Sequence, residues 1–256
     1  MSPQTLRKAV VLAAGKGTRM KELTRDLPKP MLPVQGRPIL DHILEGLAQT
    51  GFREVCIVTR YRAEVVEAHV GDGTRLGLAV TCRRQGELPG TGKAVEPARD
   101  FVGSDPFLLT YGDILVRPHT YRRVVERFQS GAYDGLVTVT RGEDVRKGGL
   151  LFFDEAFCLR RVEEKPDEAR LARLQAEGWL RPGDPAWYNA GIYVFGPAVF
   201  DHIGRLQPSP RGEYELTDAI TALIADGARI AGLEIEDRWV DVRDPETLRQ
   251  LEQGLL

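Results

Sequence analysis

The chain has 256 residues, of which 42% are hydrophobic, and a formal net charge of −2. That length can bury a substantial core, and the near-neutral charge argues against a nucleic-acid partner or an anionic membrane surface. No apolar stretch approaches the roughly 20 residues of a membrane span, no signal-peptide segment precedes the first strand, and three cysteines form no disulfide framework. We therefore expect a cytoplasmic protein.

Short apolar runs alternate with amphipathic stretches through the first half of the chain, which predicts alternating strands and helices. An alternation of this kind favours an α/β fold with a parallel sheet, helices on both faces and ligand-binding loops at one edge. We expect strands at 9–14, 54–59, 79–84, 107–110 and 135–140, and helices from 39 to a stop at Gly51, then at 62–70, 92–100 and 120–129.

The second half is less regular. Strands are expected at 150–153, 159–162, 191–195 and 231–236, and helices at 216–225 and 245–253, the last with Asp244 as its N-cap. No linker, repeat or low-complexity tract interrupts the sequence, so we expect a single domain over residues 1–256.

A glycine loop follows the first strand as Gly15-Lys16-Gly17-Thr18-Arg19. Two glycines one residue apart let backbone N–H groups converge on an anion, and an arginine fork suits phosphate oxygens. Lys29 follows between two prolines, which restrict the backbone around it. The stretch predicts a triphosphate cradle, although it is neither a Walker A loop nor a dinucleotide fingerprint, since Met20 stands at the third glycine.

Two further patterns follow later strands. The Gln85 amide offers a donor and an acceptor that match the N3–H and O4 edge of uracil or thymine, although an ordinary exposed glutamine is the alternative. Asp113 leaves a buried strand and needs a partner, for which Mg²⁺ with phosphate and water oxygens is suitable. A helix cap or a turn is the alternative for this aspartate.

The whole string from Leu12 to Leu32, with LAAGKGTRM followed by PKPML, resembles the signature of the sugar-phosphate nucleotidylyltransferases. The resemblance extends to about Leu248, with further motifs in the family's order. It implies a Rossmann-like, mixed, mainly parallel sheet flanked by helices, the nucleotide-diphospho-sugar transferase fold. It also implies a nucleotide-binding part over about 8–140, interwoven with a sugar-phosphate-binding part over about 141–240.

The resemblance assigns roles to residues that would bind the nucleotide and the metal. It implies catalytic cations at Arg19 and Lys29, with Lys29 at the α-phosphate. Metal ligands for Mg²⁺ are implied at Asp113 and at Asp241, which lies in Trp239-Val240-Asp241. The implied nucleotide-binding residues are Leu12, Ala14, Gly15, Gly17, Thr18, Gln85, Gly90 and Thr91.

The element Glu163-Glu164-Lys165-Pro166 resembles the family's E-E-K-P, whose lysine grips the sugar 1-phosphate and is counted with the catalytic cations. Glu164 is the usual sugar ligand and Glu163 the alternative. The other implied sugar-phosphate-binding residues are Tyr111, Gly149, Asn189, Gly191 and Arg211.

Three departures from the family pattern stand out. Lys93 occupies a position where a histidine, glutamine or small residue is more usual, and Arg243 replaces a commoner glycine after Asp241. Residues 167–180 predict an inserted amphipathic helix, either a lid over the sugar pocket or a contact between subunits of a homo-oligomer.

We therefore expect an enzyme that joins an NTP, with UTP or dTTP favoured, to a sugar 1-phosphate resembling glucose 1-phosphate. Its products would be an NDP-sugar and pyrophosphate. The alternatives are a cytidylyltransferase acting on a non-sugar alcohol phosphate, a mannose or heptose 1-phosphate guanylyltransferase, and a catalytically silent regulatory homologue.

Overall fold

The computed structural model describes residues 6–181 and 183–254. Within these residues nine strands form one sheet, in the order β10-β9-β11-β6-β1-β4-β5, with β8 paired to β11 and β12 paired to β8. The strands are β1 (Lys8–Ala13), β4 (Glu54–Thr59), β5 (Ala79–Arg84), β6 (Phe107–Tyr111), β8 (Gly135–Thr140), β9 (Gly149–Phe153), β10 (Leu159–Glu164), β11 (Trp187–Phe195) and β12 (Ile230–Glu234).

The expected mixed sheet flanked by helices is confirmed. Strand β1 lies between β4 and β6 and is parallel to both, and β5 continues the parallel half. Strand β11 is antiparallel to β6, β8 and β9, so the second half of the chain joins the same sheet in the opposite sense.

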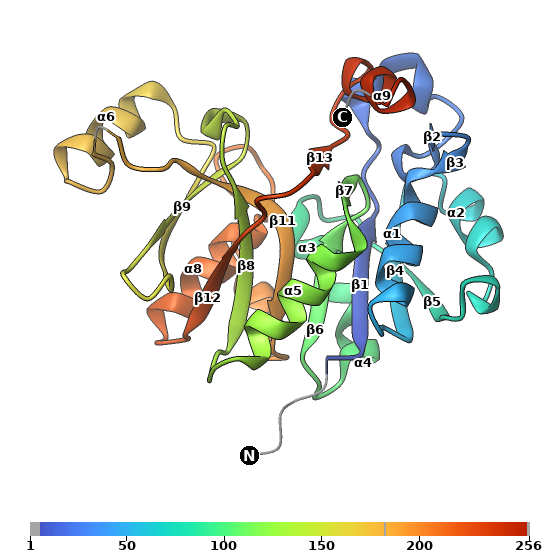
Figure 1. Ribbon diagram of the computed structural model, residues 1–256, viewed down its shortest axis with the longest axis horizontal. Coiled ribbons are helices and arrows are strands. Elements are labelled where there is room, and N and C mark those ends of the chain that lie inside the picture. Colours follow the sequence, from blue (N-terminus) through green and yellow to red (C-terminus); the bar gives the residue numbers. More distant parts are fainter. Residues whose placement is uncertain (1–5, 182, 255–256) are drawn as a thin grey trace.

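Helices cover both faces of the sheet (Figure 1). They are α1 (Ile39–Gln49), α2 (Ala63–Val70), α3 (Thr91–Val95), α4 (Arg99–Val102), α5 (Pro118–Gln129), α6 (Glu168–Ala176), α7 (Val199–Arg205), α8 (Leu216–Ala225) and α9 (Pro245–Glu252). Alternate residues of β1 pack in two different hydrophobic cores, because successive side chains of a strand point to opposite faces of the sheet. Val11 packs in the core that α1 and α5 cover, and Val10 in the core that α3, α7 and α8 cover.

Several element bounds differ from the expectation. The helix expected at 92–100 is broken into α3, a 3₁₀ turn η4 (Glu96–Ala98) and α4. Pro97 lies at the start of that turn, where it supplies no backbone donor to a continuous helix. Helix α7 was not expected at all. Asp244 does cap α9, since its side chain accepts a hydrogen bond from the Thr247 amide.

Among the described residues, two short ladders lie outside the main sheet. Strand β2 (Pro33–Val34) pairs with β3 (Arg37–Pro38), and β7 (Ile114–Val116) pairs with β13 (Trp239–Asp241), both antiparallel. The remaining 3₁₀ helices are η1 (Thr18–Thr24), η2 (Lys29–Met31), η3 (Thr74–Leu76) and η5 (Val145–Lys147). In Figure 1 β13 and α9 lie at the top of the view, beyond the carboxyl end of β1.

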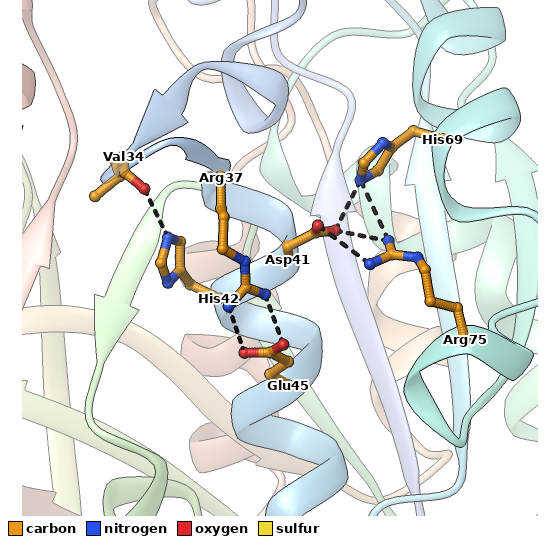
Figure 2. A network of polar contacts seen from close by, with 7 residues as sticks. All are labelled: Val34, Arg37, Asp41, His42, Glu45, His69 and Arg75. Carbon is orange, nitrogen blue, oxygen red and sulfur yellow. Dashed lines mark hydrogen bonds and ion pairs between the residues drawn. The ribbon is translucent and has the colours of Figure 1, made fainter.

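A polar network ties α1 to its neighbours (Figure 2). The buried Asp41 carboxylate accepts hydrogen bonds from Arg75 in η3, and its Oδ1 lies 2.8 Å from Nε2 of His69 in α2. Burial would raise the pKa of Asp41, but the hydrogen bonds outweigh it and leave that pKa below its ordinary value.

No helix in the described part of the chain is long and apolar enough to cross a bilayer.

Candidate active site

A cavity of about 990 Å³ opens at the carboxyl ends of β1 and β6. This is the edge at which ligands bind in open α/β sheets. Its lining includes eighteen of the twenty site residues expected from the sequence, which the fold brings together from distant segments: Leu12, Ala14, Gly15, Gly17, Thr18, Arg19, Lys29, Gln85, Gly90, Thr91, Tyr111, Asp113, Gly149, Glu164, Lys165, Asn189, Gly191 and Asp241.

The glycine loop turns sharply into η1. Gly17 has a φ of 65°, in the left-handed region that favours glycine, and a Cβ there would lie 3.0 Å from the Lys29 Cβ. The Thr24 hydroxyl donates to the Gly17 carbonyl at 3.0 Å and closes the loop. The turn leaves Arg19 exposed at the cavity, while Met20 is fully buried beneath it. The buried Met20 therefore anchors the loop that holds the Arg19 guanidinium at the cavity.

Lys29 lies between two carboxylates. Its Nζ is 2.5 Å from Oδ2 of Asp113 and 3.9 Å from Oδ1 of Asp241, and its side chain is 11% exposed. The two aspartates meet because β7 pairs with β13, and the Val242 amide donates to the Asp113 carbonyl at 3.0 Å. Burial first, and then the neighbouring Asp113 carboxylate, raise the pKa of Asp241 to about 6.

The aspartate pair fits a hard divalent ion that brings other oxygen ligands with it. Among the described residues, no group of three or more histidines, cysteines, aspartates and glutamates could hold a metal. Mg²⁺ commonly uses one or two carboxylates and takes its remaining oxygens from phosphates and water. The donor set of Asp113 and Asp241 is therefore suited to Mg²⁺ bound together with a phosphate-bearing substrate.

The loop after β5 forms another wall of the cavity. The Gln85 side-chain amide donates to the Leu88 carbonyl at 3.0 Å, which leaves its Oε1 as an acceptor. Gly90 has a φ of 108°, and a Cβ there would lie 2.4 Å from the backbone of Tyr214. The Tyr214 amide donates to the Pro89 carbonyl at 3.1 Å, and the Gly92 amide donates to the Tyr214 carbonyl at 2.8 Å. These bonds fasten the loop after β5 to the segment that precedes α8.

Glu164 and Lys165 line the cavity at the end of β10. The Thr217 hydroxyl donates to Oε2 of Glu164 at 3.2 Å, and Nζ of Lys165 lies 3.6 Å from Oε1 of that residue. Burial raises the pKa of the Glu164 carboxyl. Lys165 has a φ of 45° and donates its amide to the Gly148 carbonyl at 2.7 Å, so a turn holds its backbone.

Asn189 and Gly191 lie at an irregularity in β11, where the pairing with β8 shifts register. Gly191 has a φ of 77°, and a Cβ there would lie 2.6 Å from the Tyr111 ring. Oδ1 of Asn189 accepts hydrogen bonds from the Tyr193 hydroxyl at 2.9 Å and from the Gly191 amide at 3.3 Å. The irregularity therefore places Gly191 against the Tyr111 ring, and two hydrogen bonds fix the side-chain oxygen of Asn189.

Two expected site residues lie outside the cavity lining. Glu163 accepts hydrogen bonds from Arg161 at 2.6 Å and from Arg170 at 2.5 Å. Adjacent residues of a strand face opposite sides, so β10 directs Glu164 to the cavity and Glu163 away from it. Arg211 donates to Glu215 at 2.7 Å and lies 3.7 Å from Glu164, so it contacts two residues of the lining.

Sequence reasoning missed several lining residues: Arg60, Tyr61, Arg62, Lys147 and Tyr188. The first three follow β4, and the rule that loops after parallel strands share one edge could have identified them. The Tyr61 hydroxyl donates to the Thr24 and Arg25 carbonyls at 3.0 and 2.7 Å, so this loop supports η1.

The helix expected at 167–180 is present as α6, with Asp167 as its N-cap. Leu174 is fully buried against Leu150 and Phe152 of β9, so the chain itself covers this apolar position. Trp179 remains 39% exposed and meets Phe152 edge-on. The cavity lining in the described residues includes nothing from α6, and Figure 1 shows α6 beyond β9, away from β1.

Comparison with known proteins agrees with this arrangement. The family model described as "Nucleotidyl transferase" matches residues 8–256. A low-salt glycan biosynthesis nucleotidyltransferase of Haloferax volcanii is 33% identical over 97% of this chain and 66% of its own length. A UTP–glucose-1-phosphate uridylyltransferase of the same organism is 33% identical over 97% of this chain and 96% of its own length.

A glucose-1-phosphate thymidylyltransferase of Streptomyces griseus is 32% identical over 91% of this chain. The chain spans 62% of that relative's length. Among solved structures, UDP-glucose pyrophosphorylase complexed with UDP-glucose superimposes with a TM-score of 0.81 at 20% identity, over 98% of both chains. That likeness supports the fold.

Proposed function

Because this chain belongs to the nucleotidyl transferase family, we propose that it transfers a nucleotidyl group from an NTP to a sugar 1-phosphate, with release of pyrophosphate. The observation that carries the proposal is the distribution of cations in one cavity. Arg19 lies on the glycine loop, Lys165 lies at the end of β10, and Lys29 lies with the aspartate pair. Such a cavity suits two phosphate-bearing substrates that must meet.

The reaction we propose needs no catalytic base. The second pKa of a phosphate monoester is near 6, so its attacking oxygen is already ionised at neutral pH. Two anions must instead be brought together in line, and positioning of this kind can supply about 7–11 kcal/mol of the barrier. The residues of this chain therefore act by orientation and by charge.

We assign the roles as follows. Gly15, Gly17 and Arg19 bind the triphosphate, Lys29 stabilises charge at the α-phosphate, and Lys165 binds the sugar phosphate. Asp113 and Asp241 would hold Mg²⁺, which supplies charge neutralisation between the phosphates when bound. Glu164 and Asn189 face the sugar. Arg211 contacts Glu164 and Glu215, and we assign it to orienting those carboxylates and binding the sugar phosphate.

Gln85 favours UTP or dTTP over CTP. Its Nε2 is oriented toward the Leu88 carbonyl, and its Oε1 can accept the N3–H that uracil and thymine carry. Cytosine carries an acceptor at N3, and this atom would face Oε1 of Gln85, which is also an acceptor. Relatives named for uridylyl and thymidylyl transfer to glucose 1-phosphate add to this choice. A cytoplasmic setting stays a prediction.

A substrate matrix with a pyrophosphate-release assay tests the proposal. UTP, dTTP, CTP and GTP are each paired with glucose 1-phosphate, mannose 1-phosphate and phosphocholine, with and without Mg²⁺. We expect turnover with UTP or dTTP and glucose 1-phosphate, only with Mg²⁺. Turnover confined to CTP with phosphocholine, or none with any pair, would contradict the proposal.

Lys29→Ala tests the site assignment. We expect a loss of about 10²–10³-fold in kcat, the usual effect of removing one group that stabilises transition-state charge. Lys8→Ala is the control, because Lys8 pairs with Asp105 at 2.8 Å and does not line the cavity. A near wild-type rate for Lys29→Ala would refute the assignment.

A further inference from the structure

The aspartate pair has a second cation that the transfer mechanism does not use. Nε of Arg243 lies 3.4 Å from Oδ2 of Asp241, while Lys29 faces Oδ1 of the same carboxylate at 3.9 Å. Each oxygen of Asp241 therefore has a positive neighbour. Arg243 lines the cavity, and its side chain is 16% exposed.

Arg243 is held in place independently of Asp241. Its guanidinium donates to Oε2 of Glu143 at 2.7 Å, which is shorter than its approach to Asp241. Glu143 lies in the loop that follows β8, and its side chain is 29% exposed. A change at Asp241 therefore leaves the guanidinium anchored beside the site.

The charges beside the pair balance. Three cations, Lys29, Arg243 and the more distant Arg19, balance the three carboxylates of Asp113, Asp241 and Glu143. A divalent ion that arrives alone adds positive charge to a group already balanced, and it must compete for Oδ2 of Asp113 with the Lys29 ammonium at 2.5 Å. A nucleoside triphosphate brings several negative charges, which favour the ion and give Lys29 a new partner.

We propose that Arg243 is a positioning residue that, with Lys29, offsets the charge of the aspartate pair, so that a divalent ion binds weakly alone and enters with the triphosphate. The inference rests on the metal site of the proposed function. It concerns the order and affinity of metal binding, and the identity of the transferred group does not enter it.

Binding of Mn²⁺, measured from the electron paramagnetic resonance signal of the free ion, tests the proposal without catalysis. Removal of one positive charge beside a divalent ion in a water-like dielectric is worth about tenfold in affinity. We therefore expect Arg243→Gln to bind Mn²⁺ about tenfold more tightly than wild type without nucleotide. With UTP present and no sugar phosphate, the difference should shrink, because the triphosphate then supplies most of the negative charge.

Matched variants separate charge from structure. Arg243→Lys keeps the charge and should bind Mn²⁺ as wild type does. Arg75→Gln removes a comparable charge from the buried Asp41 outside the cavity and should have no effect. Asp241→Asn should abolish the binding, which locates the measured ion at the aspartate pair. Thermal unfolding of each variant shows that it is folded.

Equal or weaker Mn²⁺ binding by Arg243→Gln overturns the inference and leaves the transfer reaction untouched. Retention of Mn²⁺ binding by Asp241→Asn overturns it as well, since the ion would then lie elsewhere. Failure of every substrate pair would defeat the proposed function instead, while the Mn²⁺ comparison would still decide the role of Arg243.

Discussion

Asp41 is buried and Asp241 is partly buried, and both lie beside two basic side chains, yet their pKa values move in opposite directions. Arg75 and His69 bond Asp41 directly, and these bonds outweigh the effect of burial. Asp241 has its cations at 3.4 and 3.9 Å and the Asp113 carboxylate close by. One carboxylate is fully satisfied within the fold, and the other retains capacity for a further cation.

The comparison separates a structural ion pair from a binding site. A buried charge with complete hydrogen bonds holds elements together, here α1, α2 and η3. A buried charge with incomplete bonds costs stability and is useful only if a ligand completes it. The two carboxylates should therefore respond differently to the same substitution.

The largest effect is expected for Asp241→Asn. We expect kcat to fall about 100-fold or more, because one of two metal carboxylates is lost. The free energy of unfolding at pH 7 should be unchanged or higher, since an ionised carboxylate whose pKa rises on folding opposes folding above that pKa. Steady-state kinetics and urea unfolding measure the two quantities. A clear loss of stability without a loss of rate would reverse the assignment.

Asp41→Asn should show the opposite pattern. We expect a loss of about 2 kcal/mol in the free energy of unfolding, the range for hydrogen bonds to a charged group. The kcat of the folded fraction should match wild type, because Asp41 does not line the cavity. Glu45→Gln, on the same helix but in a half-exposed pair with Arg37, is the control and should change stability by less than about 1 kcal/mol. If Glu45→Gln lowers the free energy of unfolding as much as Asp41→Asn does, the burial of Asp41 is not the cause of its larger contribution.

The pH dependence of stability sharpens the contrast. The pKa of Asp41 is lowered on folding, so its contribution is present above the ordinary value of 3.8 and is lost as pH falls from that value through the lower pKa of the folded state. The pKa of Asp241 is raised from 3.8 to about 6, so ionisation of this group removes stability as pH rises across that interval. Urea unfolding of wild type and both variants at several pH values should give differences of opposite slope. Parallel slopes would contradict the two environments.

The smallest effect is expected for Arg75→Gln. The Arg75 side chain is 51% exposed, so solvent screens its interaction, and His69 remains beside Asp41. We expect a loss of about 1 kcal/mol or less in the free energy of unfolding, again by urea. A loss larger than that of Asp41→Asn would show that Arg75 acts through other contacts.

The sequence predicted the helices and strands whose apolar residues extend over enough positions to show a helical or strand periodicity. Strand β1 and helix α1 carry full hydrophobic faces, and the glycine loop and lysine between them follow from turn chemistry. Strands β7 and β13 have three residues each, too few for a periodic signal, although their pairing brings Asp113 to Asp241. The expected meeting of these aspartates therefore came from the family resemblance.

Other features depend on information that residue patterns do not contain. Adjacent glutamates in β10 occupy opposite faces, and only the packing decides that Glu164 faces the cavity while Glu163 pairs with arginines. Arg243 was recognised as unusual in its position, but its anchor, Glu143, is 100 residues away in the sequence. Contacts of that range are set by the complete fold.

The backbone contact between Gly90 and Tyr214 limits how this protein could be redesigned. Two backbone hydrogen bonds join residues 89–92 to Tyr214, and there is no room for a side chain at position 90. An exchange of the 207–215 segment to alter sugar choice would also move the wall that holds Gln85. The loop after β5, which holds Gln85, and the 207–215 segment would therefore have to be exchanged together.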